Sequence, residues 1–160
     1  MLGWAVMPSA SQVIANVVLP NLMKLKGAST VVSAIERRDA AMFTQVFAQT
    51  GVQHAPQLVA KERDDWRIGV CTLPAPKEMG DPHMVAFVAK KNDAATTRYF
   101  TLEHDYVLAT KSDRTVVVER EGARGTKHGD GPAPTGDAMT DASAFVDAIM
   151  EVIAPTRVKR

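Results

Sequence analysis

Residues 83–104 read HMVAFVAKKNDAATTRYFTLEH, and this stretch decides the fold. Two runs rich in Val, Phe, Tyr and Thr flank a polar centre, which is typical of a β-hairpin. A turn centred between Asp93 and Ala94 predicts a register in which Phe87 lies opposite Phe100. The face that carries these two rings is therefore expected to pack against the core.

The same register places His83 opposite His104, at the end of the hairpin farthest from the turn. Directly opposed residues have Cβ atoms about 4.5–5.5 Å apart, close enough for two imidazoles to share a divalent metal ion. Asp81 and Asp105 are the nearby carboxylates that could act as a third ligand. We predict a candidate metal site formed by His83, His104 and Asp81, and no other cofactor. The alternatives are a metal-free histidine pair at the sheet rim and a pH-sensitive element.

Alternating apolar residues extend the sheet on both sides of this hairpin. The expected strands are a run beginning at Trp66 and the segments 83–90, 97–109 and 114–120. Turn residues separate these runs, so we predict a four-stranded antiparallel meander within 66–120.

The turn into the last of these strands leaves two registers to compare. A two-residue turn at Ser112-Asp113 pairs Asp105 with Arg120. A turn centred on Ser112 pairs Asp105 with Glu119, which is disfavoured because like charges would face each other.

The first part of the chain, residues 1–51, has apolar residues at helical spacing. The first expected helix has Ser9 as its N-cap, an apolar stripe at Val13, Ile14, Val17 and Val18, a stop or restart at Pro20 and an end at Gly27. A second helix is expected to begin at a cap at Ser29 or Thr30. Another apolar stripe follows at Met42, Phe43, Val46 and Phe47, with an end at Gly51. Asp39 either lies within one long helix from 30 to 50 or caps a new helix.

Residues 121–137 contain five of the ten glycines and are expected to form a mobile loop. A helix over 138–154 follows, with Asp137 or Thr140 as its cap and Pro155 as its stop. The chain is thus predicted to be a single α+β domain, residues 1–160. Its architecture is expected to be a two-layer sandwich, with the N-terminal helices and the C-terminal helix on one face of the sheet.

The composition narrows the classes of function. The chain has 160 residues, and 19 Lys and Arg oppose 18 Asp and Glu, giving a formal net charge of +1. A chain with this balance has no overall positive charge to attract nucleic acid. Polar residues interrupt the apolar sequence near the N-terminus, which disfavours a membrane span. An export signal begins with a basic segment, and none precedes the first apolar run of this sequence. The single cysteine, Cys71, cannot form an internal disulfide. We therefore expect a cytoplasmic protein with a buried, unreactive thiol.

The glycine-rich segment contains a second candidate site. Arg124, Lys127 and His128 supply positive charge among glycines that free the backbone amides, a composition suited to an anion-binding loop. The spacing departs from the phosphate-binding pattern G-x-x-x-x-G-K-[ST], and about a dozen residues separate it from the next helix. A flexible connector is therefore expected, and the alternative is a segment that orders when it binds a ligand or partner.

No residue set has convincing catalytic spacing. Glu103, His104 and Asp105 are adjacent, but alternation on a strand directs the histidine to the face opposite the two acids. The uncharged helix between Val13 and Pro20 is expected to be buried on all sides or against a partner. We therefore predict a non-catalytic protein-binding or adaptor-like domain that engages a protein partner or forms a homo-oligomer. The alternative is a small metal-dependent or small-molecule-processing enzyme at the His83/His104 end of the sheet.

Overall fold

The fold is described from a computed structural model. The structure describes residues 10–37, 39, 41–43, 45, 57–73, 80–91, 93–121 and 124–154, with backbone alone at 93–96. The predictions that concern Ser9, Val46, Phe47, Gly51 and Pro155 lie outside the described residues.

The centre of the molecule is a six-stranded antiparallel sheet in the order β1-β2-β3-β4-β5-β6. Its strands are β1 (Gln57–Arg63), β2 (Trp66–Thr72), β3 (Pro82–Lys90), β4 (Asp93–Val107), β5 (Ser112–Glu121) and β6 (Arg124–Asp130). The predicted meander is correct in kind, but the predicted count of four strands is wrong. The charged sequence of β1 concealed one strand, and the glycines of β6 concealed another.

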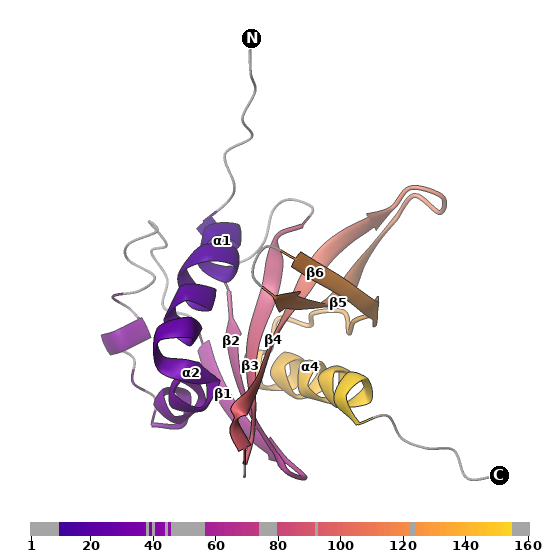
Figure 1. The fold of residues 1–160 in the computed structure, drawn as a ribbon. Coiled ribbons are helices and arrows are strands. Elements are labelled where there is room, and N and C mark those ends of the chain that lie inside the picture. The colour runs from indigo at the N-terminus through magenta and orange to yellow at the C-terminus, as the bar shows by residue number, and fades with distance from the viewer. Residues whose placement is uncertain are drawn as a thin grey trace, which may run out of the picture.

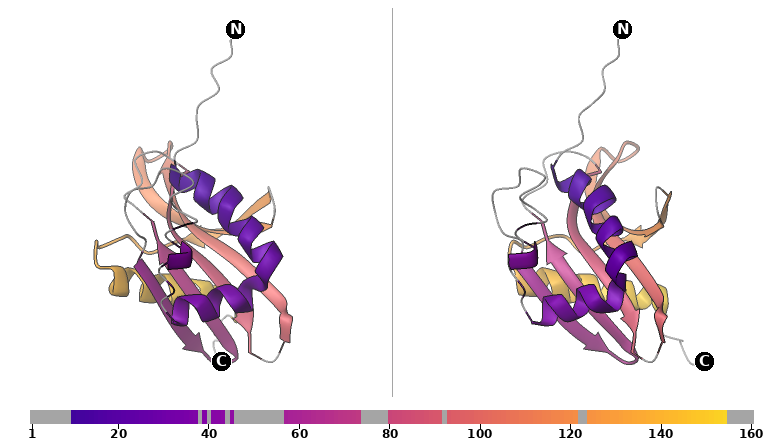
Figure 2. Two further views of the ribbon diagram at one scale, coloured as in Figure 1. Left: turned by 90° about the vertical axis from the view of Figure 1, so that its left-hand side faces the viewer. Right: turned by 60° about the vertical axis from the view of Figure 1, so that its left-hand side comes forward.

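Helices cover both faces of the sheet, so the predicted two-layer arrangement is also wrong. α1 (Ala10–Val13), the π-helix η1 (Ile14–Val18) and α2 (Leu19–Glu36) lie on one face, and α4 (Ala138–Ile153) lies on the other. Figure 1 shows the sheet edge-on between them, and Figure 2 shows the N-terminal helices in front of the strands with α4 behind. Strand β3 reads VAFVA without alternation because both of its faces are buried.

The register of β3 and β4 differs by one residue from the prediction. Phe87 lies opposite Tyr99, and Ala86 lies opposite Phe100. A slip of one residue moves every side chain to the other face. Phe87 consequently packs with the N-terminal helices while Phe100 packs with α4, so the prediction that the two rings share a face is wrong.

The turn between β4 and β5 lies earlier than either predicted position. Residues 108–111 form it, and Asp105 lies opposite Arg114 rather than Arg120 or Glu119. The Arg114 Nε donates to Asp105 Oδ2 at 3.0 Å. Asp105 therefore faces an arginine, as the preferred register required, but the arginine is Arg114 and not Arg120.

The glycine-rich segment is not the loop that was expected throughout 121–137. Its first half forms β6, which pairs along the outer edge of β5 with a bulge between Val117 and Val118. The second half, residues 131–137, has no regular structure and leads into α4. The cap predicted for α4 is present, since Asp137 Oδ2 accepts from the Thr140 N–H at 3.0 Å.

Pro20 explains the π-helix. The Leu19 N–H donates to the Ile14 carbonyl, five residues earlier, and the next carbonyl, that of Ala15, would need an N–H at position 20. The Tyr99 hydroxyl donates to the Ala15 carbonyl instead. The helix therefore passes through Pro20 rather than ending there.

Three further predictions concern the N-terminal helices. The helix breaks at Gly27, where φ is +78°, and this positive φ favours glycine. Beyond α2, Asp39 Oδ1 accepts from the Met42 N–H at 3.3 Å, as the alternative with a new cap requires. The helix around Val17 is not buried on all sides within the chain, because the Val17 side chain is exposed; the alternative, burial against a partner, stays a prediction.

Among the described residues, no helix is both long and apolar enough to cross a membrane.

Cys71 is buried as expected, and burial raises the pKa of its thiol to about 12. A thiolate nucleophile at this position is therefore disfavoured at neutral pH.

Candidate functional site

His83 and His104 come together at one end of the sheet, although they are not register partners. Pro82 lies opposite Glu103 and Met84 opposite Leu102, so His83 is the extra residue of a bulge. The two imidazoles stack with ring centroids 5.9 Å apart and an interplanar angle of 15°. The predicted neighbourhood is therefore present, and a bulge produces it rather than the predicted register.

The two rings have different surroundings. His83 Nε2 is buried and has no hydrogen-bond partner in the described part of the chain, whereas His104 Nε2 lies 3.2 Å from Asp113 Oδ1. The pKa of His83 is lowered, chiefly by burial and then by the charge of His104, while Asp81 and Asp141 act in the opposite sense. His83 is therefore a largely neutral imidazole near pH 7.

The predicted metal ligands are close to one another, but the rings are stacked. An imidazole nitrogen binds a metal in the plane of its ring, so two stacked rings would have to turn before they could share one ion. Asp81 is buried, and its backbone carbonyl accepts from the His104 N–H at 3.1 Å. Among the described residues, no group of three or more His, Cys, Asp or Glu side chains is placed to hold a metal ion. The metal site stays a prediction.

Two cavities meet at His83 and Pro134. One, of about 460 Å³, extends to Thr72 and Asp141, and the other, of about 390 Å³, extends to His104 and Asp113. We call the two cavities the histidine cleft, and four residues of 131–137 line them. Its size and its polar groups suit a small organic molecule.

Asp141 binds the segment 131–137, which lines the histidine cleft, through three hydrogen bonds. Its carboxylate accepts from the Thr135 N–H at 2.8 Å, the Thr135 hydroxyl at 2.7 Å and the Gly136 N–H at 3.1 Å. The Thr115 hydroxyl donates to the Pro132 carbonyl at 2.9 Å. This part of the glycine-rich segment is thus fixed by specific hydrogen bonds.

The two acids beside His104 already have partners. Glu103 is buried and accepts from Arg120 and from the Thr101 hydroxyl. Asp105 pairs with Arg114, and this pairing lowers the pKa of its carboxyl group. A general acid at neutral pH needs a raised pKa, so neither the pairing of Glu103 nor the pKa of Asp105 favours that role.

The predicted anion-binding residues lie on β6 but do not converge. Lys127 Nζ lies 3.7 Å from Asp105, and His128 Nε2 lies 3.0 Å from Glu119. Asp105 and Glu119 belong to opposite faces of the sheet, because each lies an odd number of positions from the other across the ladder of β4 and β5. Arg124 has no partner among the described residues. The three residues therefore do not form one anion site.

The sequence analysis missed the feature that protrudes farthest from the sheet. Beyond His104 and Thr115, the described parts of β4 and β5 pair only with each other. Figure 1 shows this hairpin end, residues 105–114, extending past the rest of the sheet, and we call it the arm. The turn of the arm lies at 108–111 rather than at the predicted Ser112-Asp113. A correct position for this turn would have revealed the arm.

The arm carries two large apolar side chains that face solvent. Tyr106 is 37% exposed and Leu108 is 79% exposed. A two-residue turn at Ser112-Asp113, as predicted, would place Leu108 opposite Val117, within the sheet. Because the turn begins at Leu108, that side chain lies at the tip instead.

Comparison of the chain with protein-family models, with curated proteins and with solved structures finds no match. The comparisons therefore assign no role to any residue of this chain.

Proposed function

We propose that this chain is a non-catalytic protein-binding domain and that the arm is part of its contact surface. The observation that carries the proposal is the exposure of Tyr106 and Leu108 on a hairpin end that extends past the sheet. Tyrosine is among the residues enriched at the centres of protein interfaces, and the exposed Leu108 lies two residues from Tyr106. At the base of the arm Arg114 forms ion pairs with both Asp105 and Asp130.

The state of the titratable groups supports a binding role over catalysis. The acids nearest His104 are engaged with arginines, and the Cys71 thiol is buried. A two-stranded ribbon is marginally stable by itself in water, so burial of its apolar side chains against a partner would stabilise it. The partner expected from this chemistry is a protein with an apolar pocket that receives Leu108.

The experiment places a photo-crosslinking amino acid at position 108 and identifies the cross-linked protein by mass spectrometry. That protein is then purified and its affinity for the intact domain is measured. The proposal expects Leu108→Ser to weaken the purified complex at least about tenfold, a loss of about 1.4 kcal/mol. Met139→Ser, a matched change at an exposed methionine of α4, is expected to leave the affinity unchanged. A complex that tolerates Leu108→Ser would contradict the proposal.

A second candidate is a small-molecule or metal-dependent activity in the histidine cleft, and the observation that favours it is the position of His83 between two cavities. His83→Ala and His104→Ala variants test it. The activity requires that these changes abolish binding of zinc or of a small ligand by the purified protein. Unchanged metal content and unchanged thermal shifts with a metabolite library would exclude it.

A further inference from the structure

A cavity of about 570 Å³ lies between the N-terminal helices and strands β4 and β5, and we call it the helix–sheet cavity. Its helical wall consists of residues 16, 17, 20, 21, 23 and 24, and its sheet wall consists of residues 97–99 and 119–121. The helical positions follow the spacing of one helical face. The volume lies within the range of about 300–1,000 Å³ that is typical of small-molecule sites.

The π-helix contributes an apolar contact to this cavity. Val17 belongs to η1, lines the cavity and is 52% exposed. Met23, which packs partly buried against the core, lines the cavity beside it. Single π turns occur frequently at functional sites. The helical wall therefore offers apolar surface that the fold itself does not cover.

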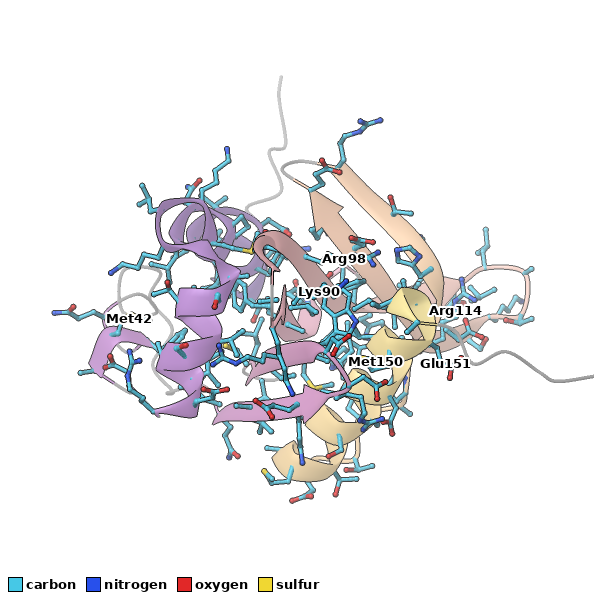
Figure 3. All side chains as sticks on the ribbon, turned by 60° about the horizontal axis from the view of Figure 1, so that its bottom comes forward. Met42, Lys90, Arg98, Arg114, Met150 and Glu151 are labelled. Atoms are coloured by element: carbon cyan, nitrogen blue, oxygen red, sulfur yellow. The ribbon has the colours of Figure 1, made fainter. Side chains whose placement is uncertain are left out.

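Strand alternation decides which charged side chains of the sheet face the cavity. Tyr99 packs with the N-terminal helices, and Glu103 lies four residues further along β4, on the same face. Arg120 donates to Glu103 and so also belongs to this face. Arg98, which is labelled in Figure 3, lies over the Phe100 ring and so belongs to the α4 face.

The two acids of the sheet wall extend from the opposite face. Glu119 binds Arg98 on the α4 side, and Glu121 lies two residues further along β5, on that same face. Arg120 from the sheet and Lys24 from α2 are consequently the charged side chains that face the helix–sheet cavity. Both of them are cations.

Arg120 is oriented by a buried carboxylate and has donors to spare. A guanidinium carries five N–H donors in a planar fork. Two of those of Arg120 bind Glu103 Oε2, and the other three have no partner among the described residues. The Arg120 side chain is 22% exposed, whereas Glu103 is buried. An anion in the cavity can therefore bind a guanidinium that is already held in position.

The helical wall adds polar groups without internal partners. Asn16, Asn21 and Lys24 line the cavity with exposed side chains. None of the three forms a hydrogen bond or an ion pair within the part of the chain that the structure describes. The ammonium group attracts an anion, and the amides can donate to one.

The combination of apolar surface and cations specifies the class of ligand. An inorganic anion would leave Val17 and Met23 uncovered, and a neutral hydrocarbon would leave the donors of Arg120 unused. Arg120, Lys24 and Glu103 carry two positive charges and one negative charge, a balance of 2 − 1 = +1. One carboxylate neutralises this charge, whereas a phosphate monoester carries about −1.5 to −2.

We propose that the helix–sheet cavity binds a small organic carboxylate with an apolar body. Its carboxylate group binds the unpaired N–H groups of Arg120 and the ammonium group of Lys24, and its apolar body contacts Val17 and Met23. This inference goes beyond the proposed protein-binding function and does not depend on it, because no residue of the arm lines the cavity.

The test measures binding of octanoate to the purified full chain by isothermal titration calorimetry. Octanamide is the neutral counterpart, and acetate is the counterpart without an apolar body. We expect saturable 1:1 binding of octanoate and at least about tenfold weaker binding of the other two compounds. Amide chemical shifts in NMR spectra should change at 16–24, 97–99 and 119–121.

Two pairs of variants at exposed positions examine the helical wall. Val17→Asp and Lys24→Gln are expected to weaken octanoate binding at least about tenfold and threefold, respectively. Leu25→Asp and Lys26→Gln make the same changes at exposed residues of α2 that do not line the cavity. These controls are expected to alter the affinity less than about twofold.

Arg120→Lys examines the sheet wall, because it keeps a cation beside Glu103 and removes the planar fork. We expect octanoate binding to weaken at least about tenfold. Thermal unfolding verifies that each variant is folded. Should Arg120→Lys fail to fold, the variants at Val17 and Lys24 still decide the outcome.

Several results would overturn this inference. Equal affinity for octanoate and octanamide, or tighter binding of octyl phosphate, would contradict the carboxylate class. Chemical shift changes confined to the histidine cleft, or equal effects of Val17→Asp and Leu25→Asp, would contradict the site. The absence of saturable octanoate binding in the millimolar range would contradict both, and the cross-linking experiment at Leu108 would be unaffected.

Discussion

The Tyr99 hydroxyl donates to the Ala15 carbonyl, the one carbonyl of the π-helix that Pro20 leaves without a helical donor. Tyr99 belongs to β4, so a strand of the sheet completes the hydrogen bonding of the N-terminal helix. Both residues are buried, and an unsatisfied carbonyl at this depth would lose its water as well as its partner.

Tyr99→Phe is expected to lower the free energy of unfolding by about 1–3 kcal/mol, because the Ala15 carbonyl remains buried without a donor. Urea unfolding monitored by circular dichroism measures the change. Tyr106→Phe is the matched control, since the ring of Tyr106 is partly exposed on the arm. Equal stabilities of the two variants would show that the Tyr99 hydrogen bond does not support the π-helix.

Arg120→Leu is expected to destabilise the domain strongly, because it leaves the carboxylate of Glu103 buried without its cation. The side chains of Arg120 and Glu103 are 22% and 10% exposed. Loss of one member of a buried pair costs about 3–5 kcal/mol, and the partial exposure of Arg120 favours the lower end.

Arg114→Leu serves as the comparison for Arg120→Leu, since it breaks two ion pairs at the surface. Exposed ion pairs contribute little to stability, so chemical denaturation should show a clearly smaller change than for Arg120→Leu. The reverse order would mean that Glu103 does not depend on Arg120.

Acidification is expected to destabilise the domain through His83. Its pKa is lowered from the ordinary value of 6.5 in the folded protein, chiefly by burial and then by His104. The unfolded state therefore takes up the proton first, and stability falls as the pH decreases from 6.5 towards the folded pKa. Above that window both states are neutral at this residue, and His83 makes no titration contribution.

Unfolding of the wild type and His83→Gln between pH 7.5 and 5 measures this effect, together with an NMR titration of the His83 ring. The difference in stability between the two proteins should change in the direction that favours His83→Gln as the pH falls. A His83 ring that titrates at or above 6.5 would contradict the expectation.

Gly69→Ala is expected to destabilise the domain because α2 approaches β2 closely at this residue. A Cβ at position 69 would lie 2.6 Å from Ile35 Cδ1 and 3.4 Å from Val32 Cα. Overpacking of a core typically costs about 1–3 kcal/mol.

Ile35→Val removes the atom that a Cβ at Gly69 would meet. The double variant Gly69→Ala/Ile35→Val should therefore be more stable than the sum of the two single changes predicts, and thermal unfolding of the three variants measures this coupling. Strict additivity would show that the contact with Ile35 is not the source of the cost.

The sequence indicated the strands that carry most of the core, but it did not fix their register. Phe87 and Phe100 are both large and apolar, and each face of β3 is buried, so either assignment of faces agrees with the hydrophobic pattern. A register is well specified by sequence when one face is polar. The residues 94–96, inserted on the β4 side near the turn, shift the pairing by an amount that turn composition alone does not reveal.

The proximity of His83 and His104 was predicted, while the reason given for it was wrong. The one-residue slip would separate the two rings, and the bulge at His83 brings them back together. Bulges depend on the local balance between strand pairing and packing. The cavities around the pair depend on residues 131–137, which were expected to be mobile and are instead tied to Asp141.

Hydrophobic periodicity and capping residues are local properties, and they determined the α+β class, the antiparallel meander and the start of α4 at Asp137. The assignment of faces, the strand β6 and the exposure of Leu108 were decided by tertiary structure. Each of them depends on which distant segments pack together, since a side chain is exposed or buried, and an edge open or covered, only with respect to neighbours that the local sequence does not specify.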